Sequence, residues 1–476
     1  MNRSNMTVRS GIQNLLFVMI SQGVSLVLGI VKALVLPLTL SIMNFGYWQV
    51  YLLYLSYVGI LSFGFNDGIY LRYGTYNYKD LPKSLFRTSI RFFVLFQIVL
   101  MFICFFLIVQ YEPNKDKLYA LFWVAINIPV AGLSGVFIYV LQITNQLKKY
   151  SFYNVIDKLL VLIVIGILFL LNKNQVNLFI IADSFSRIIV LVILCYSCRD
   201  ILFGRGASLK LAIPEFVENI RVGIQLMLAN LAGMLVLGFG RFVVERFENV
   251  SIYGGYSFAI STLNLVLVLI SAIGLVLYPT LNRLDSKKFK EYFKNINILT
   301  SIFSFVTLLS YYLLVYFIRK FMESYTGILT YLPFIFGILY IQIKMQILIN
   351  PFYKLLREER SMLKANVAGL ILAVTIIIPS YLIFKSVSAI AIGTFIAMGI
   401  RLYLSEFFMY RKLNLREYKT IVFEVILITL FFLVSYKFEK ITGLILYITI
   451  LLLYVCTNMK FLSRIIRSIL SKGDDR

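Results

Sequence analysis

Apolar stretches of about 17–25 residues alternate along this chain with short polar connections. Each stretch is long enough to cross the hydrocarbon core of a bilayer, roughly 30 Å thick, as an α-helix. The hydropathy pattern predicts about fourteen transmembrane helices, at residues 12–36, 42–63, 85–109, 118–141, 153–171, 176–197, 220–240, 254–279, 296–318, 326–349, 364–384, 387–409, 420–436 and 441–459. The expected fold is therefore that of an all-α, polytopic membrane protein.

Every second connection between these stretches is rich in Lys and Arg, and the connections between those are poor in them. Of the 46 Lys and Arg residues, 31 fall in one alternate set of loops and flanks, 10 fall in the other set, and 5 fall within the spans. Because Lys and Arg are retained in short cytoplasmic loops, this bias predicts that both termini are cytoplasmic. The N-terminal apolar run continues from Ile12 to about Leu36, too long for a signal peptide, so we interpret it as the first span.

Composition agrees with a multi-pass membrane protein. Hydrophobic residues make up 60% of the chain, charged residues 14%, and the mean hydropathy is +0.87, values that exclude a soluble domain of this length. The net charge of +24 is explained by basic cytoplasmic loops, so we expect no nucleic-acid partner.

The cysteines do not predict a metal site. Cys104 and Cys456 fall within spans, and Cys195 and Cys198 form one CxxC at a cytoplasmic helix end. The chain has no His and no second cysteine pair near this one, whereas a structural zinc site needs four such ligands. We therefore expect neither a metal nor a cofactor.

Short motifs recur after six spans. The triplet GIQ opens the first span at residues 11–13 and the seventh at 223–225, while FGYW at 45–48 and GGYS at 254–257 open the second and eighth. Parallel repeats of this kind build two-lobed transporters with a substrate cavity between the lobes. The predicted division is a six-helix lobe at 1–210, a second at 211–412, and two additional transmembrane helices with a cytoplasmic tail at 413–476.

Four motifs carry a resemblance to a known family. They are GFNDGIYLRYG at 64–74, GRFV at 240–243, GYSFA at 255–259 and YPTL at 278–281. In this order they resemble the polysaccharide flippases of the multidrug/oligosaccharidyl-lipid/polysaccharide exporter superfamily, and most closely the O-antigen and capsule repeat-unit flippases. One departure is Gly240, where family members often carry an acid before the arginine.

The resemblance implies a V-shaped pair of lobes that alternates between inward-open and outward-open states. The implied substrate is a polyprenyl-diphosphate-linked oligosaccharide, whose head group passes through the central cavity while its lipid tail stays in the bilayer. The partners implied are this lipid, the bilayer, an H⁺ or Na⁺ coupling ion, and the polysaccharide polymerase and chain-length proteins of the same pathway. The chain is not expected to be an enzyme.

Cations inside the spans are the candidate substrate-binding residues. An ionisable side chain at membrane depth usually faces a cavity or a partner, and a diphosphate is recognised by Arg and Lys. Alternatives stay open for three of them: interfacial snorkelling for Lys32 and Arg241, and a structural salt bridge for Arg187. The predicted cavity cations are Lys32, Arg187, Arg241, Lys344 and Arg401; Lys158 is a further intramembrane cation.

The acids near these cations are either their partners or coupling residues. Asp183 lies four residues before Arg187, on the same helix face, so the two are expected to pair. Asp157, Glu406 and Glu424 lie toward cytoplasmic helix ends, where pairing with a nearby Lys or Arg is the more common role and proton transfer the alternative.

Three functions compete on the sequence alone. A flippase agrees with the basic excess within the spans, whereas a multidrug or cation exporter of the same fold favours acidic cavity residues. A polysaccharide polymerase or glycosyltransferase usually needs a sizeable outer loop, and no predicted outer loop is long enough to fold separately.

The charge bias gives a direct test of the predicted topology. Reporter fusions at Lys148 and Lys288 are expected to indicate the cytoplasm, and fusions at Lys115 and Lys437 the outside, because Lys and Arg are enriched in the first set of loops. A reversed result at any of the four positions contradicts the fourteen-helix topology.

Overall fold

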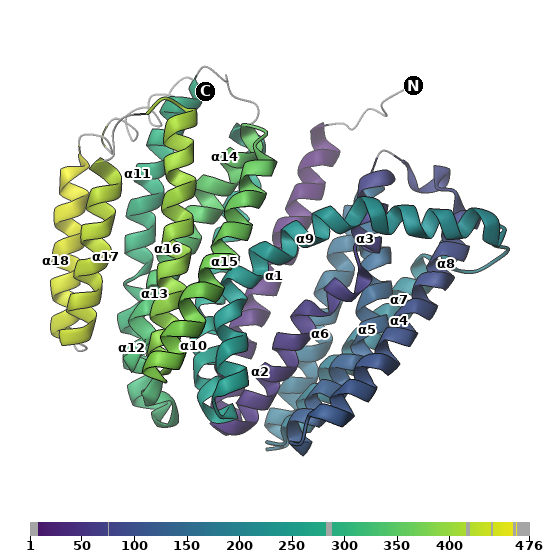
Figure 1. The fold of residues 1–476 in the computed structure, drawn as a ribbon, viewed down its shortest axis with the longest axis horizontal. Helices are drawn as coiled ribbons and strands as arrows, with labels where there is room; N and C mark the ends of the chain where they lie inside the picture. The colour runs from purple at the N-terminus through teal and green to yellow at the C-terminus, as the bar shows by residue number, and fades with distance from the viewer. Residues whose placement is uncertain are drawn as a thin grey trace. The chain divides into compact units, whose positions relative to one another are not determined.

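The computed structural model describes residues 8–74, 76–281, 288–415, 419–438, 441–459 and 463. Within these ranges every regular element is helical (Figure 1). By the contacts among its residues the chain divides into two compact units, Met1–Val268 and Leu269–Arg476, and the division falls inside one helix, α10.

The helices have the following bounds. The first unit contains α1 (Val8–Thr39), α2 (Ile42–Tyr57), η1 (Val58–Ser62), α3 (Phe65–Arg72), η2 (Tyr78–Asp80), α4 (Lys83–Tyr111), α5 (Lys115–Ile143), α6 (Leu147–Leu170), α7 (Val176–Ser197), α8 (Arg199–Leu202), α9 (Leu209–Phe247) and the start of α10 (Val250–Leu281). The second unit contains the end of α10, α11 (Phe289–Thr307), α12 (Ser310–Phe321), η4 (Glu323–Thr330), α13 (Leu332–Lys344), η5 (Met345–Ile349), α14 (Asn350–Leu355), α15 (Glu359–Phe384), α16 (Val387–Lys412), α17 (Lys419–Lys437) and α18 (Ile441–Thr457).

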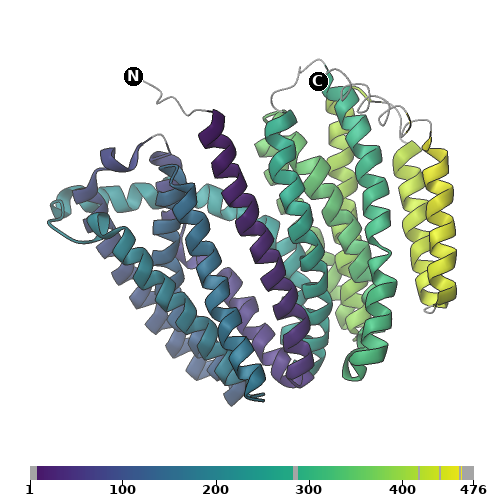
Figure 2. The same cartoon turned by 180° about the vertical axis from the view of Figure 1, so that it is seen from behind.

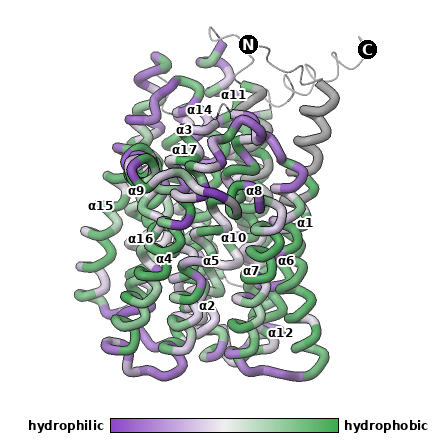
Figure 3. Tube along the Cα trace, turned by 90° about the vertical axis from the view of Figure 1, so that its right-hand side faces the viewer, coloured by the Kyte–Doolittle hydropathy of each residue, from purple (hydrophilic) through white to green (hydrophobic). Residues whose placement is uncertain are grey.

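The predicted membrane spans all coincide with helical segments. Among the described residues, 11 helices are long and apolar enough to cross a membrane, and the bent pair Ile42–Ser62 and Phe65–Arg72 makes a twelfth. The shorter apolar helices Gly23–Thr39 and Ile441–Thr457 occupy the first and last predicted positions. Figure 3 shows hydrophobic residues along the helices and hydrophilic residues mostly toward their ends. The prediction of an all-α polytopic membrane protein is confirmed.

Helix α9 is longer than the sequence predicted. The expected cytoplasmic connection at 198–219 contains the short helix α8 and the first turns of α9, which runs on to Phe247. Its first half lies across the ends of α3 and α4, and its second half descends beside α2 (Figure 1). Charged residues in these first turns lowered the hydropathy there, but Ala212 and Asn219 are buried against neighbouring helices, so packing extends the helix.

A bend at Phe63 and Gly64 lets α3 approach α9. The two residues have φ of 50° and 83°, in the left-handed region, and the span turns by 57° there. A Cβ on Gly64 would lie 2.5 Å from the backbone nitrogen of Ile224, and a Cβ on Gly223 would lie 2.0 Å from the carbonyl oxygen of Gly64. Glycine is therefore required on both helices for their backbones to touch.

A second backbone contact joins α2 to α10 at the opposite end of the span. A Cβ on Gly46 would lie 2.2 Å from the carbonyl oxygen of Val250, and a Cβ on Gly254 would lie 2.5 Å from that of Ile42. The glycines in the motifs at 64–74, 223–225 and 254–257 thus mark the places where α2 and α3 meet α9 and α10.

In the first unit, α9 and the start of α10 pack with helices of the predicted first lobe, and the division at residue 210 stays a prediction.

Helix α1 completes the first unit by packing along α6. Figure 2 shows α1, in dark purple, from behind, and the Lys158 ammonium of α6 donates a 2.6 Å hydrogen bond to the Ser25 hydroxyl of α1. In the second unit α13 and α14 occupy the centre: 89% of an 18-residue window of the span Leu332–Leu355 is buried. It contacts α11, α16 and α17, while α15 and α16 pack as a pair.

The α3–α9 contact predicts a sharp difference between two glycine substitutions. Gly223→Ala forces the two backbones apart, and overpacking of this kind typically costs about 1–3 kcal/mol. Gly166→Ala on α6 meets nothing within 4 Å and is expected to be neutral or stabilising, since Ala is the better helix former. Thermal unfolding of the two purified variants measures this, and an equal effect contradicts the contact.

Candidate functional site

The charged residues within the first unit gather around one buried carboxylate. Asp183 of α7 is fully buried, and its Oδ2 accepts a 2.8 Å hydrogen bond from Arg187 Nε, so the predicted pair forms. Its Oδ1 lies 3.2 Å from the Nζ of Lys32 on α1. Lys32 and Arg187 keep about a quarter and a third of their side chains exposed, at 25% and 32%.

Neutral groups hold the carboxylate from the remaining side. The Tyr51 hydroxyl of α2 donates a 3.0 Å hydrogen bond to Asp183 Oδ2 and lies 3.0 Å from the Ser184 hydroxyl. Asn127 of α5 donates to the same Ser184 oxygen at 2.9 Å. Three helices besides α7 therefore supply groups that bind Asp183 or the adjacent Ser184: α1, α2 and α5. A fourth helix, α6, places Asp157 near this pair.

Asp157 adds a second acid to this group. No Lys or Arg of the described residues lies within ion-pair distance of its carboxylate, but Arg187, Lys32 and Lys158 are close enough to act on it electrostatically. The group formed by Lys32, Lys158, Arg187, Asp157 and Asp183, hereafter the α1–α6–α7 charge cluster, has three cations and two acids. It carries an excess of positive charge inside the first unit.

Arg241 lies apart from this cluster, where α9 meets α2 and α10. Its Nη2 donates to Gln49 Oε1 at 3.1 Å and to the Tyr253 hydroxyl at 3.4 Å. Four residues further along α9, Glu245 accepts from the Tyr54 hydroxyl at 3.0 Å and pairs with Lys117 at 2.6 Å. Arg241 is thus bound to neutral groups here, with an acid one turn away.

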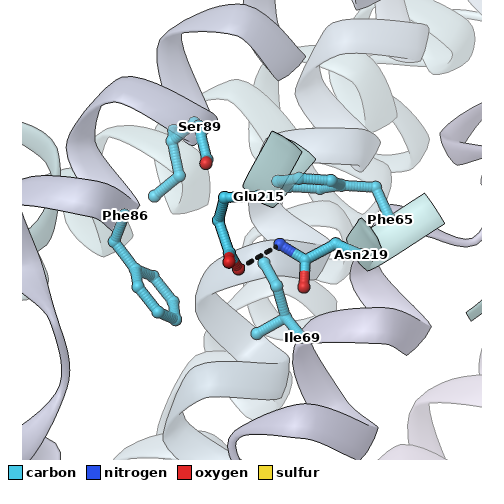
Figure 4. Close-up of a pocket in the computed structure, with 7 residues that line it drawn as sticks. Phe65, Ile69, Phe86, Ser89, Glu215 and Asn219 are labelled. Atoms are coloured by element: carbon cyan, nitrogen blue, oxygen red, sulfur yellow. Dashed lines mark hydrogen bonds between the residues drawn. The ribbon is translucent and has the colours of Figure 1, made fainter. Parts of the chain in front are cut away.

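At the other end of the bent span, α3 is clamped to α9 by an ion pair. Arg72 makes two parallel hydrogen bonds to Glu215, of 2.6 and 2.9 Å, and its Nη1 also donates to Asn219 Oδ1 at 2.6 Å. Figure 4 shows Glu215 and Asn219 joined by a hydrogen bond of 3.0 Å and surrounded by Phe65, Ile69 and Phe86. The pocket between them has no room for a water molecule, so the contact is closed.

The second unit contains a fully buried ionic group, formed by Lys344, Glu406 and Glu424. The Lys344 ammonium lies 3.1 Å from both carboxylate oxygens of Glu406 and 2.7 and 2.8 Å from those of Glu424. The side chains of all three residues are 0% exposed. We call this arrangement the α13–α16–α17 triad, after the helices that contribute its members.

Arg401 is buried beside the triad's helices without an acid. Its Nη2 donates to Asn366 Oδ1 at 2.5 Å, its side chain packs over Gly369 of α15, and 6% of the residue is exposed. Among the described residues no carboxylate lies within ion-pair distance of this guanidinium.

The structure therefore separates the predicted site residues into groups. Lys32 and Arg187 share one cluster with Asp157 and Asp183. Lys344 is enclosed by Glu406 and Glu424, and Arg241 and Arg401 each bind neutral side chains. The sequence did not single out Tyr51, Glu215 or Glu245, because their partners lie more than a hundred residues away along the chain.

The fold is shared with known membrane flippases and multidrug transporters. One solved structure, of the lipid II flippase MurJ in an inward closed conformation, is similar with a TM-score of 0.64 at 13% identity, over 95% of this chain and 100% of that one. The structure of the multidrug transporter DinF-BH, solved with a bound ligand, has a TM-score of 0.57 at 15% sequence identity. The match covers 86% of this chain and 96% of that one. The structure of a transporter of the MOP superfamily from Pyrococcus furiosus has a TM-score of 0.52 at 12% sequence identity. The match covers 85% of this chain and 95% of that one.

These similarities show that the chain shares the all-α fold of these membrane proteins. The chain belongs to the polysaccharide biosynthesis protein family, whose pattern its residues 12–285 match. No curated protein is recognisably similar to it in sequence. The predicted family resemblance is thus confirmed.

The geometry of the charge cluster predicts unequal effects of two alanine substitutions. Asp183→Ala leaves both Lys32 and Arg187 without their acid, and removing one partner of a buried pair typically costs about 3–5 kcal/mol. Arg187→Ala leaves Asp183 bound to Lys32 and Tyr51, so its cost is expected to be smaller.

The yield and thermal stability of folded protein in detergent measure the difference. The double change Asp183→Ala with Arg187→Ala is expected to recover part of the loss caused by Asp183→Ala alone. Arg221→Ala, which breaks an exposed pair with Glu218 of 3.7 Å, is the control and is expected to change stability by less than about 0.5 kcal/mol. Equal losses for Asp183→Ala and Arg187→Ala would contradict the shared pairing.

Proposed function

We propose that this protein moves a polyprenyl-diphosphate-linked oligosaccharide, the repeat unit of an O-antigen, capsule or exopolysaccharide, from the cytoplasmic to the outer leaflet by alternating access. The membrane would be the bacterial cytoplasmic membrane, with both termini in the cytoplasm. The direction is the one that the family resemblance implies, and the orientation is inferred from the basic loops.

The observation that carries the proposal is the positive α1–α6–α7 charge cluster. Arg187 uses its Nε on Asp183, and no described residue accepts a hydrogen bond from its two terminal nitrogens. Those nitrogens match the paired oxygens of a phosphate, while the partly exposed Lys32 adds a point charge beside them. An anionic head group is therefore the ligand that this cluster fits best.

The family and the fold support a lipid-linked substrate. The matched family is one of polysaccharide biosynthesis, and the first of the similar structures is named a lipid II flippase. The predicted cavity cations Arg241, Lys344 and Arg401 are proposed to contribute in other states of the transport cycle, since here they are bound to protein groups.

The second candidate is export of a lipophilic cation, because one similar structure is that of a multidrug transporter. A cationic drug needs acidic or neutral cavity residues. Three cations against two acids in the α1–α6–α7 charge cluster disfavour that ligand.

The energy source is proposed to include the membrane potential. An inside-negative potential assists the outward movement of an anion by about 2.3 kcal/mol per charge per 100 mV. Cavity cations that move together with the head group reduce the free energy that the membrane potential contributes. An exchanged H⁺ or Na⁺ would then supply the driving force.

Flipping of a labelled polyprenyl-diphosphate oligosaccharide in proteoliposomes tests the proposal, with potential, H⁺ and Na⁺ gradients imposed one at a time. The wild-type protein is expected to move the lipid, and Arg187→Ala or Lys32→Ala to slow it by at least tenfold. Lys437→Ala, at the end of α17, is the control and is expected to transport normally. The double change Asp183→Ala with Arg187→Ala is expected to restore folded protein without restoring flipping.

The same vesicles distinguish the second candidate. If folded protein accumulates a cationic rhodamine dye in these vesicles and does not move the lipid, the flippase proposal is overturned. Indifference of lipid movement to every imposed gradient overturns coupling and leaves downhill facilitation.

A further inference from the structure

The α13–α16–α17 triad contains one cation and two acids, all without contact to solvent. If both glutamates were ionised, the group would hold an uncompensated negative charge in the dry centre of the second unit. Burying an unpaired charge is far more costly than burying a neutral carboxylic acid, so such a group normally takes up a proton.

We propose that the α13–α16–α17 triad is a proton-binding site in which Glu406 holds one proton while Lys344 and Glu424 stay ionised. The site is separate from the α1–α6–α7 charge cluster, and it needs no substrate to form.

The hydrogen bonds decide which glutamate is neutral. Glu424 accepts from Lys344 with both oxygens and from the Tyr340 hydroxyl at 2.7 Å, donors that stabilise a carboxylate. It also contacts the Ser301 hydroxyl, whose one proton is shared between this contact and the backbone carbonyl oxygen of Asn297 at 2.7 Å. Glu406 has longer contacts to Lys344, of 3.1 Å, and one further donor, the amide of Asn297 at 3.1 Å.

The amide of Asn297 is able to pair with Glu406 in either protonation state of that acid. Asn297 is 1% exposed, and among the described residues its Oδ1 has no hydrogen-bond partner although its Nδ2 faces Glu406. The oxygen and nitrogen of an amide exchange places by a half-turn of the side chain. After that turn, Oδ1 accepts the proton of a neutral Glu406 or of the Tyr410 hydroxyl, and Nδ2 takes the position that has no partner among the described residues.

Lys344 is the cation that contacts both carboxylates, and a second cation, Lys294 of α11, lines a small pocket with Asn297 and Tyr410. The other titratable groups that face the acids are phenols from the packed helices, with the hydroxyl of Ser301 on α11; the phenols are Tyr340, Tyr403, Tyr410 and Tyr454. A metal ion is not the expected ligand, because the Lys344 ammonium already lies between the two carboxylates, 2.7–3.1 Å from their oxygens.

The site also connects a rare type of backbone to the C-terminal helices. Lys344 is the last residue of α13, and the chain continues through a π-helical turn at Met345–Ile349, a conformation that is rare overall and frequent at functional sites. Glu424 belongs to α17, so the triad joins the predicted additional helices to α13 and α16. Loss of the proton places net negative charge among three helices and is expected to loosen α17.

A role for this proton in transport rests on the proposed flippase function, whereas the presence of the proton does not. The two are therefore measured separately.

Infrared spectroscopy of the purified protein in lipid tests the presence of the proton directly. Glutamate labelled with ¹³C at the side-chain carboxyl shifts only glutamate bands, which separates them from buried aspartates such as Asp67. The wild-type protein is expected to show one label-sensitive band of a protonated carboxylic acid at neutral pH, and absence of that band overturns the proposal without any variant.

Three variants assign the band to the triad. Glu406→Gln and Glu424→Gln each leave one acid paired with Lys344, so both are expected to lose the band. Lys344→Met removes the cation, so both glutamates are expected to be protonated and the band to double. The control is Glu358→Gln, which removes a partly exposed glutamate paired with Lys412 in the same unit and is expected to leave the band unchanged.

Thermal unfolding against pH gives a second readout. Because the folded protein holds a proton that an unfolded glutamate releases at neutral pH, stability is expected to fall as the pH rises from the range where an unfolded glutamate titrates to the pH at which the folded triad loses its proton, and to level off above that pH. Glu406→Gln is expected to remove this dependence, and an unchanged dependence overturns the assignment to Glu406. If the wild-type protein shows the infrared band and Glu406→Gln loses flipping, the site is linked to transport. If Glu406→Gln flips the lipid normally, only that link is overturned.

Discussion

The cost of placing charge inside a bilayer governs the arrangement of this protein. Six cations are predicted at or near membrane depth, and each of them is bound to a polar or acidic group of another helix or of its own. Because lipid offers no alternative hydrogen-bond partner, these contacts fix which helices are neighbours. Asp183 draws α1 and α7 together, and Lys344 draws α16 and α17 to α13.

Close backbone contact supplies the second constraint. Hydrophobic burial does not by itself select partners among apolar helices in lipid, so small residues and shape decide the packing. Gly64 and Gly223 allow α3 and α9 to touch, and Gly46 and Gly254 do the same for α2 and α10. The ion pair of Arg72 and Glu215 then closes the end of the first of these contacts.

The two ionic groups differ in ways that match different roles. The α1–α6–α7 charge cluster has an excess of cations, partial exposure and unused guanidinium nitrogens, features suited to an anionic ligand that comes and goes. The α13–α16–α17 triad has an excess of acids and no exposure, features suited to a proton, the one ligand that needs no space. We therefore propose ligand recognition for the first group and proton binding for the second, within a fold shared by a flippase and a multidrug transporter.

The sequence by itself determined the fold class, the positions of the spans and the family. Hydropathy is a property of contiguous residues, and crossing a bilayer sets the length of each helix, so each predicted span coincides with helical segments, although α9 extends well beyond its predicted start. The pair of Asp183 and Arg187 was also predictable, because four residues make one turn of a helix. Only the tertiary structure decided that Lys32 joins that pair, that Lys344 lies between two glutamates, and that Tyr51 and Glu215 belong to these contacts. Those partners are separated by tens to more than a hundred residues, and which faces of fourteen similar apolar helices meet depends on packing that no local pattern records.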